Sequence, residues 1–193
     1  MRLRIIAAAL ILSAAAGVAA DAAFAGAPAA PAPVERVSAE RVSAETGPVE
    51  NVSVETVLVE KAERRLHLVD AAGTVLKSYT IALGRDPIGP KQREGDGRTP
   101  EGRYTIDWRN PNSAYHLSLH ISYPDAADRR RAAERGEDPG GMIMIHGLRN
   151  GLGWLGALHH YADWTDGCIA VTNEEIEEIW RLVPNGTPIE IRP

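Results

Sequence analysis

One cysteine and one histidine stand at the ends of two short apolar segments. Cys168 is the only cysteine among 193 residues, and it follows Asp166-Gly167 and leads into the apolar run 169–171. His146 ends the apolar run 142–145. Runs this short and apolar, bounded by glycine, predict buried strands. One sheet holding both strands can bring the thiol and the imidazole within hydrogen-bond reach. Cysteine catalysis needs that arrangement, because a free thiol is only a few per cent thiolate near neutral pH.

The backbone beside the cysteine suits the same chemistry. A glycine at position 167 lets the chain approach a substrate carbonyl closely, and the N–H groups of Gly167 and Cys168 are the expected oxyanion donors. The plainer alternative is that Cys168 is a small buried hydrophobe, as free cysteines often are. Its polar neighbours favour the catalytic interpretation. So does the export signal described below, because an unpaired thiol outside the cell is a liability unless it is used.

These residues belong to a longer pattern. Ile145-His146-Gly147 followed by Thr165-Asp166-Gly167-Cys168-Ile169 resembles the His-Gly … Ser/Thr-x-Gly-Cys signature of the L,D-transpeptidase (YkuD) catalytic domain, and most of all its YafK-like branch. The resemblance extends to residues 89–104, which contain Gly-Asp-Gly-Arg-Thr-Pro-Glu-Gly-x-Tyr, and to residues 116–128, which contain Ser-Leu-His-Ile-Ser-Tyr-Pro. It therefore covers most of the chain after Val52.

The resemblance implies a fold, a reaction and a partner. The fold would be a mainly β, sandwich-like catalytic domain with peripheral helices. Cys168 would be the nucleophile and His146 the base, with Gly147 beside it in a supporting role. The substrate would be a peptidoglycan stem peptide, which forms a thioester before transfer to an amine. Hydrolysis of a stem peptide or of a protein-to-peptidoglycan cross-link stays open, as does a non-catalytic wall-binding module.

Two positions depart from the wider family pattern. Asp166 stands where many members have histidine, and we expect it to cap its own turn, the alternative being a residue that contacts the substrate or supports the site. Ala170 stands where many members have arginine or asparagine. If that arginine holds a substrate carboxylate, another residue must do so here, and Arg149 is the candidate.

A sortase would fit the order His146, Cys168, Arg181, but the Gly-Asp-Gly-Arg-Thr-Pro-Glu-Gly run has no place in that pattern.

Composition limits the other possibilities. The chain is 44% apolar and 24% charged, with a net charge of −5, which suits one globular domain and argues against a nucleic-acid-binding surface. One cysteine excludes an internal disulfide and any multi-cysteine zinc site. The adjacent His159 and His160 match no dependable zinc spacing. We expect no metal, no cofactor and a monomer.

Residues 1–51 differ from the rest. Residues 1–25 have a short positive start, an apolar run and small residues, which predict a secretory signal peptide and a protein of the periplasm or cell envelope. If the signal were retained, it would be the only contact with the membrane. Residues 26–51 are rich in Ala and Pro and then alternate in charge, which predicts a linker. The catalytic domain is then 52–193.

Strand patterns dominate that domain. We predict a meander of strands at 54–60, 65–69 and 75–83, a polar loop at 84–98, and further strands at 103–108, 115–123 and 187–191. Helices are predicted at 125–135 and from Thr172 onward, and a loop with a short helix at 148–161 should cover the cleft. Along 115–123 the polar face carries His116 and Ser118. We expect these two to line the cleft beside His146, the alternative being simple exposure to solvent.

Overall fold

A computed structural model describes residues 53–193, so the predicted signal peptide and linker, and the predicted start of the domain at Val52, lie outside the described residues. The strands are β1 (Thr56–Glu60), β2 (Arg65–Val69), β3 (Val75–Thr80), β4 (Gly102–Ser113), β5 (His116–Ile121), β6 (Met144–His146), β7 (Ile169–Ala170) and β8 (Pro188–Arg192). The helices are α1 (Ala126–Glu134), α2 (Asn173–Leu182) and the 3₁₀ helix η1 (Gly153–Tyr161). In this part of the chain, no helix combines the length and apolar character needed to cross a bilayer.

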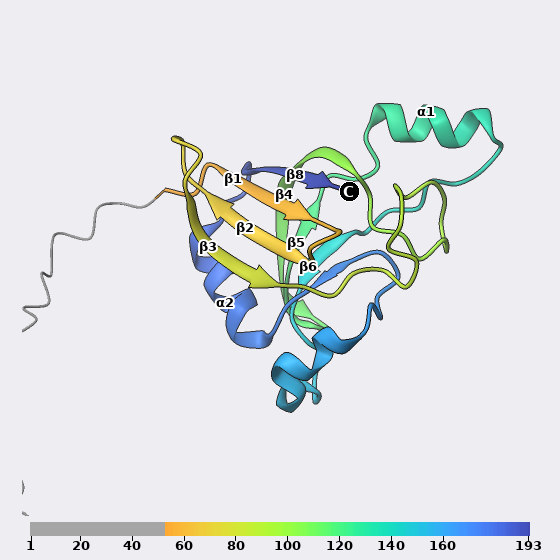
Figure 1. Cartoon of the computed structure of the whole chain (residues 1–193). Coiled ribbons are helices and arrows are strands. Elements are labelled where there is room, and N and C mark those ends of the chain that lie inside the picture. Colours follow the sequence, from red (N-terminus) through yellow and green to blue (C-terminus); the bar gives the residue numbers. More distant parts are fainter. Residues whose placement is uncertain (1–52) are drawn as a thin grey trace, which may run out of the picture. The chain divides into compact units, whose positions relative to one another are not determined.

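The strands form one sheet in the order β3-β2-β1-β8-β4-β5-β6-β7. Strand β4 is long enough to belong to both halves, since residues 102–105 pair with β8 and residues 106–113 pair with β5. Figure 1 shows β5 and β6 passing behind the β1–β2–β3 meander. The segment after β3 forms bridges from Ala82 to Ala170 and from Gly84 to Thr165, so the two ends of the strand order meet. The prediction of a mainly β fold with few helices is confirmed.

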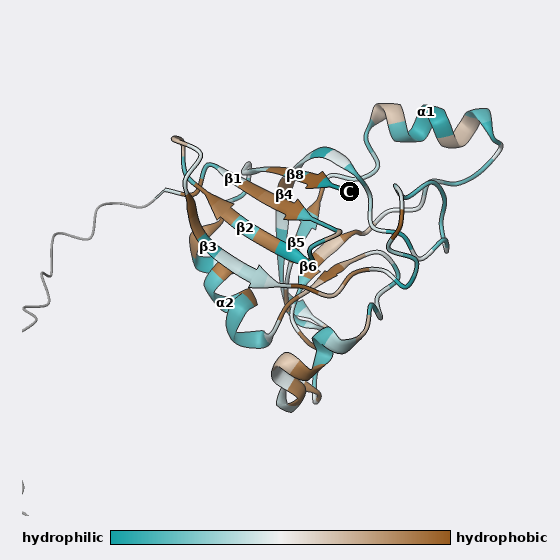
Figure 2. Cartoon of the chain, viewed as in Figure 1, coloured by the Kyte–Doolittle hydropathy of each residue, from teal (hydrophilic) through white to brown (hydrophobic). Residues whose placement is uncertain are grey.

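Both halves of the sheet contribute to one apolar core. Every second residue of β1 and β2 is fully buried, and these strands are strongly hydrophobic in Figure 2. The opposing half contributes side chains from β5, β6 and β7 to the same cluster. Its central members are Val57, Val59, Leu66, Leu68, Leu119, Ile121, Ile145 and Ile169. Full burial stabilises the fold by about 1.5–3 kcal/mol for each large aliphatic side chain. The strands of the site are therefore held by the core itself.

The two α-helices begin where the sequence predicts. Asp125 caps α1, and Thr172 caps α2 through a reciprocal pair of hydrogen bonds with Glu175. Helix α1 is mostly hydrophilic (Figure 2), whereas α2 buries Ile176 and Ile179 and packs against β5 and β6. Helix α2 therefore supports the strands that carry the candidate site.

Two strands start later than their sequence patterns predict. His116 and Met142 both have left-handed backbone conformations, with φ of 66° and 56°. A residue in that conformation cannot continue the extended alternation of a strand. In the predicted strand 115–123, side chains therefore alternate between the two faces only from residue 117 onward. Strand β6 begins at Met144 instead of Met142. Both departures fall beside the candidate site.

Candidate active site

Strands β6 and β7 lie side by side and parallel, with Ile145 opposite Ile169 and His146 opposite Ala170. Cys168 immediately precedes β7 and so falls beside Met144. Since alternate residues share one face of a sheet, Cys168 and His146 project to the same side. Both line one cavity of about 260 Å³, which we call the nucleophile cavity. Its lining comprises Asn110, Ser113, Tyr115, Ser118, Met142, Met144, His146, Trp164, Thr165, Asp166 and Cys168.

The imidazole of His146 is buried and held in one orientation. Its ring centre lies 4.6 Å from that of Tyr115 and 5.7 Å from that of Trp164. Its Nδ1 lies 2.6 Å from the carbonyl oxygen of Gly147. A carbonyl only accepts hydrogen bonds, so Nδ1 carries the proton and Nε2 keeps its lone pair. Burial lowers the pKa of His146, although the Gly147 carbonyl opposes this shift. At neutral pH the ring is therefore an uncharged base.

The thiol of Cys168 is partly exposed and bonded to the backbone. Its Sγ accepts a hydrogen bond from the N–H of Met144 at 3.4 Å and donates to the carbonyl of Met142 at 3.7 Å. Burial raises the pKa of Cys168, whereas the hydrogen bond from the Met144 N–H and the charge of Lys91 act in the opposite direction and lower it. The thiol thus bonds to the strand backbone, whereas the sequence led us to expect a bond to the imidazole. The resting thiol is therefore protonated, and a nucleophilic role would require transfer of its proton to a base.

The turn before Cys168 is fixed by Thr165. The Thr165 hydroxyl accepts a hydrogen bond from the N–H of Gly167 at 3.1 Å and donates to the carbonyl of Cys168 at 2.7 Å. The N–H of Gly167 is therefore occupied, which differs from its predicted role as an oxyanion donor. The N–H of Cys168 has no such bond within residues 53–193, so it is the remaining donor of the predicted pair.

Gly167 is required for a different reason, which is close packing. Its φ is 121°, and a Cβ atom there would lie 2.5 Å from the carbonyl oxygen of Arg98. Gly84 is equally confined, because its Cβ would lie 2.0 Å from the carbonyl oxygen of Gly97. The Gly-Asp-Gly-Arg run therefore packs directly against the nucleophile turn.

A buried lysine and a partly buried aspartate hold that run in place. Lys61 donates to the carbonyls of Gly89 and Thr99 and to the Glu101 carboxylate. Burial alone would raise the pKa of Asp96, but three backbone N–H groups and the Lys91 ammonium hold it below its usual value. The loop predicted at 84–98 is thus a rigid support for Cys168.

Some of the remaining predicted site residues line the nucleophile cavity, and others do not. Ser118 is buried, pairs with His146 across β5 and β6, and lines the nucleophile cavity. His116 does not, because its left-handed backbone directs the ring to Glu177 on α2, with Nε2 and Oε1 2.8 Å apart. Tyr115 lies in the cavity instead. Sequence reasoning missed Tyr115 and Trp164 as neighbours of His146, although Trp164 directly precedes the Thr-x-Gly-Cys motif.

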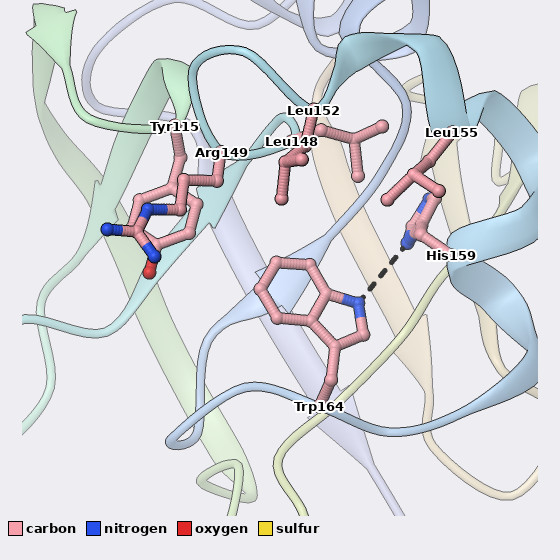
Figure 3. Close-up of a pocket in the computed structure, with 7 residues that line it drawn as sticks. All are labelled: Tyr115, Leu148, Arg149, Leu152, Leu155, His159 and Trp164. Carbon is pink, nitrogen blue, oxygen red and sulfur yellow. Dashed lines mark hydrogen bonds between the residues drawn. The ribbon is translucent and has the colours of Figure 1, made fainter.

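Asp166 also lines the nucleophile cavity, whereas Gly147 and Arg149 do not. Asp166 is exposed and forms an ion pair with Arg85, so the prediction that it caps its own turn is wrong, and Thr165 does that instead. Gly147 packs against α2, where a Cβ would lie 2.8 Å from Oδ1 of Asn173. Arg149 is exposed and lines a second pocket next to the nucleophile cavity (Figure 3).

Replacing Thr165 with valine should weaken both the fold and the site. The buried N–H of Gly167 would lose its acceptor, which costs about 1–3 kcal/mol of unfolding free energy. The Cys168 turn would also lose its tether, so turnover should fall about tenfold. Urea unfolding and turnover assays measure the two effects. Thr80→Val is the matched control, since that hydroxyl accepts only a surface bond from Arg65; equal losses in both variants would refute the role of Thr165.

His159 makes the stability of the domain depend on pH. It is buried, and its Nδ1 accepts from the indole N–H of Trp164 at 3.5 Å. Burial and the neighbouring rings of His160 and His146 lower the pKa of His159 to about 4. Because the folded-state pKa is below the unfolded one, the folded state should lose stability as pH falls from about 6.5 to about 4.

Urea unfolding at several pH values measures this loss. His159→Gln should flatten the profile, whereas Ser78→Ala, at an exposed hydroxyl on the meander that does not titrate, should not. An unaltered slope in the His159 variant would count against the assignment.

Within residues 53–193, no three His, Cys, Asp or Glu side chains are grouped as metal ligands.

The family of the chain follows from a direct match. Residues 55–191 match the family model of the L,D-transpeptidase catalytic domain, YkuD. The chain belongs to this family. A curated relative, the L,D-transpeptidase-family protein YafK of Escherichia coli strain K12, is 36% identical over 129 residues, which are 64% of this chain and 44% of YafK.

Solved structures agree with this L,D-transpeptidase fold. The helical cell shape determining protein Pgp2 of Campylobacter jejuni, solved as a point mutant, superposes with a TM-score of 0.58 and 26% identity, covering 74% of this chain and 48% of that one. Bd1075 of Bdellovibrio bacteriovorus gives a TM-score of 0.52 at 25% identity, covering 73% and 48%. The chain thus spans about half the length of the relatives it matches.

Proposed function

We propose that this domain catalyses acyl transfer through a thioester on Cys168, with a peptidoglycan stem peptide as the acyl donor. The observation that carries the proposal is the shared nucleophile cavity, in which the thiol of Cys168 and the neutral imidazole of His146 face the same space. The family supplies the substrate class, since L,D-transpeptidases act on stem peptides.

The reaction begins as Sγ of Cys168 attacks the carbonyl carbon of the scissile amide. The thiol proton moves to Nε2 of His146, and negative charge builds on the carbonyl oxygen, where the Cys168 N–H donates. The carbon–nitrogen bond then breaks. His146 gives its proton to the departing amine, which leaves a thioester and a neutral imidazole.

The second half repeats these steps in reverse. An acceptor amine attacks the thioester carbon and loses a proton to His146, and the sulfur departs and takes that proton back. The products are a new amide and the free thiol of Cys168. If water takes the place of the amine, the product is a shortened stem. Peptidoglycan lies outside the cytoplasmic membrane, so this activity requires export, which the predicted signal peptide would provide.

The test is to incubate the purified chain with muropeptides and identify the products by mass spectrometry. A new amide bond between two stems shows transfer to an amine, and a stem shortened by one residue shows transfer to water. Cys168→Ala serves as the inactive control. Muropeptides that remain unchanged, or products that form equally with Cys168→Ala, would rule out the proposed reaction.

A further inference from the structure

A row of four side chains crosses the sheet and ends at the nucleophile. The strand registers place Trp108 of β4 opposite His120 of β5, and His120 opposite Met144 of β6. Cys168 comes next, because it immediately precedes β7 and falls beside Met144. Residues paired across strands share one face of a sheet. All four side chains therefore project to the face that carries the nucleophile cavity, which Met144 and Cys168 line.

The far end of this row is an oriented group of three side chains. The rings of Trp108 and His120 stack, with centres 4.9 Å apart and planes 20° from parallel. The Asp107 carboxylate accepts from Nδ1 of His120 at 2.6 Å, which leaves Nε2 for another partner. Nε2 makes no hydrogen bond within residues 53–193 and is not sealed from solvent. We call Asp107, Trp108 and His120 the aromatic platform.

Neither the fold nor the proposed mechanism accounts for the aromatic platform. Trp108 is 37% exposed and is no member of the apolar core. The pairing of β4 with β8 ends at Thr105, so Trp108 lies beyond the last residue that β8 covers. Tryptophan is favoured at binding surfaces, where its ring packs on a ligand and its edge stays in water. The platform therefore has the composition of a ligand site on the same face as the nucleophile.

A sugar ring matches the chemistry of this platform. A pyranose has a face made of C–H groups, which packs on the negative face of an aromatic ring. The hydroxyls at its rim bond to carboxylate oxygens and imidazole nitrogens, which Asp107 and His120 supply. A purely apolar ligand would remove the Asp107 carboxylate from water without giving it a new partner, which costs free energy.

The length of the row fits a sugar that carries a stem peptide. Neighbouring strands lie about 4.8 Å apart, so Trp108 stands about 14 Å from Cys168. A stem tetrapeptide that loses its last residue reacts at its third, and three extended residues span about 10 Å. The first residue of the stem is joined to a sugar of the glycan strand. A donor stem extended along the row therefore brings that sugar to the aromatic platform.

We propose that the aromatic platform binds the sugar that carries the donor stem. Trp108 packs on the C–H face of the sugar, and the Asp107–His120 pair bonds to its hydroxyls. The stem then crosses Met144 to reach Cys168. This inference rests on the proposed function and specifies its substrate, which is a stem still attached to glycan in preference to a free peptide.

Binding to the full chain carrying Cys168→Ala tests this proposal without depending on the thioester. Two ligands contain the same tetrapeptide: the disaccharide-tetrapeptide muropeptide, and the tetrapeptide freed of its sugars. Isothermal titration calorimetry should show about tenfold tighter binding of the muropeptide, which is the upper end of what one aromatic stacking contact provides.

Paired variants in the same Cys168→Ala background locate the effect. Trp108→Ala should lower the affinity for the muropeptide about tenfold and leave that for the free tetrapeptide unchanged, which also shows that the variant is folded. Trp108→Phe keeps an aromatic ring and should retain most of the preference. Trp154→Ala is the control, because Trp154 is exposed on η1 and is no part of the row. It should leave both affinities unchanged.

Two results would overturn the inference: equal affinity for the two ligands, including no binding of either, or an equal loss of affinity for both in Trp108→Ala. Turnover of muropeptides by the wild-type chain separates this failure from that of the proposed function. A chain that turns over stems but shows either binding result retains the proposed function and loses only the sugar site.

Discussion

Cys168→Ala should abolish turnover of muropeptides, with a loss of roughly 10⁴-fold or more, because no other group in the nucleophile cavity can form the thioester. Cys168→Ser should be nearly as inactive. A serine hydroxyl fills the same place but ionises far less readily than a thiol. The fold should change little, since the side chain is small and partly exposed. Product analysis by mass spectrometry measures the loss, and urea unfolding checks the fold.

The serine variant is the sharper of the two controls. It keeps a donor near the Met142 carbonyl and an acceptor near the Met144 N–H, so the turn should retain its geometry. Turnover by either variant within tenfold of wild type would mean that the cysteine is structural. The domain would then be a wall-binding module or would use another nucleophile.

His146→Gln should reduce turnover by about 10²–10⁴-fold, the usual contribution of a general base. A glutamine amide can still donate to the Gly147 carbonyl, but it cannot take the proton of the thiol. The loss should shrink as pH rises. Burial raises the pKa of Cys168, so the variant gains thiolate only as pH climbs through a value above the ordinary one for cysteine.

The wild-type chain should respond to pH differently. Burial lowers the pKa of His146, so its imidazole is already an available base at neutral pH, and turnover should decline only at lower pH. His116→Gln is the matched control, because that ring is bonded to Glu177 outside the cavity. It should retain nearly full activity. If the His116 variant lost as much activity as the His146 variant, the base would have been assigned to the wrong histidine.

The sequence predicted the parts of the fold that depend on local patterns. The capping residues Asp125 and Thr172 identify the starts of both α-helices, and the alternation of apolar residues along the sequence predicts the β1–β2–β3 meander. The two short apolar runs place His146 and Cys168 beside the same cavity. These features rest on spacing within a few residues, which a single sequence displays directly.

The errors come from contacts that are distant in sequence or from single backbone angles. One left-handed residue at His116 separates that ring from the cavity and leaves Tyr115 there. Asp166 forms an ion pair with Arg85, which is distant from it in the sequence. The N–H of Gly167 donates its hydrogen bond to the Thr165 hydroxyl. The long polar loop gave no sign that its backbone packs against Gly167. No spacing rule encodes such contacts.

The most direct test of the account is to trap the acyl-enzyme and locate it. The wild-type chain is mixed with a stem tetrapeptide, quenched in acid, and weighed intact by mass spectrometry before peptide mapping. The account predicts an added mass equal to the donor minus its terminal amino acid, carried on the peptide containing Cys168 and released by hydroxylamine. Turnover with no such adduct at any time point, or an adduct on a residue other than Cys168, would contradict it.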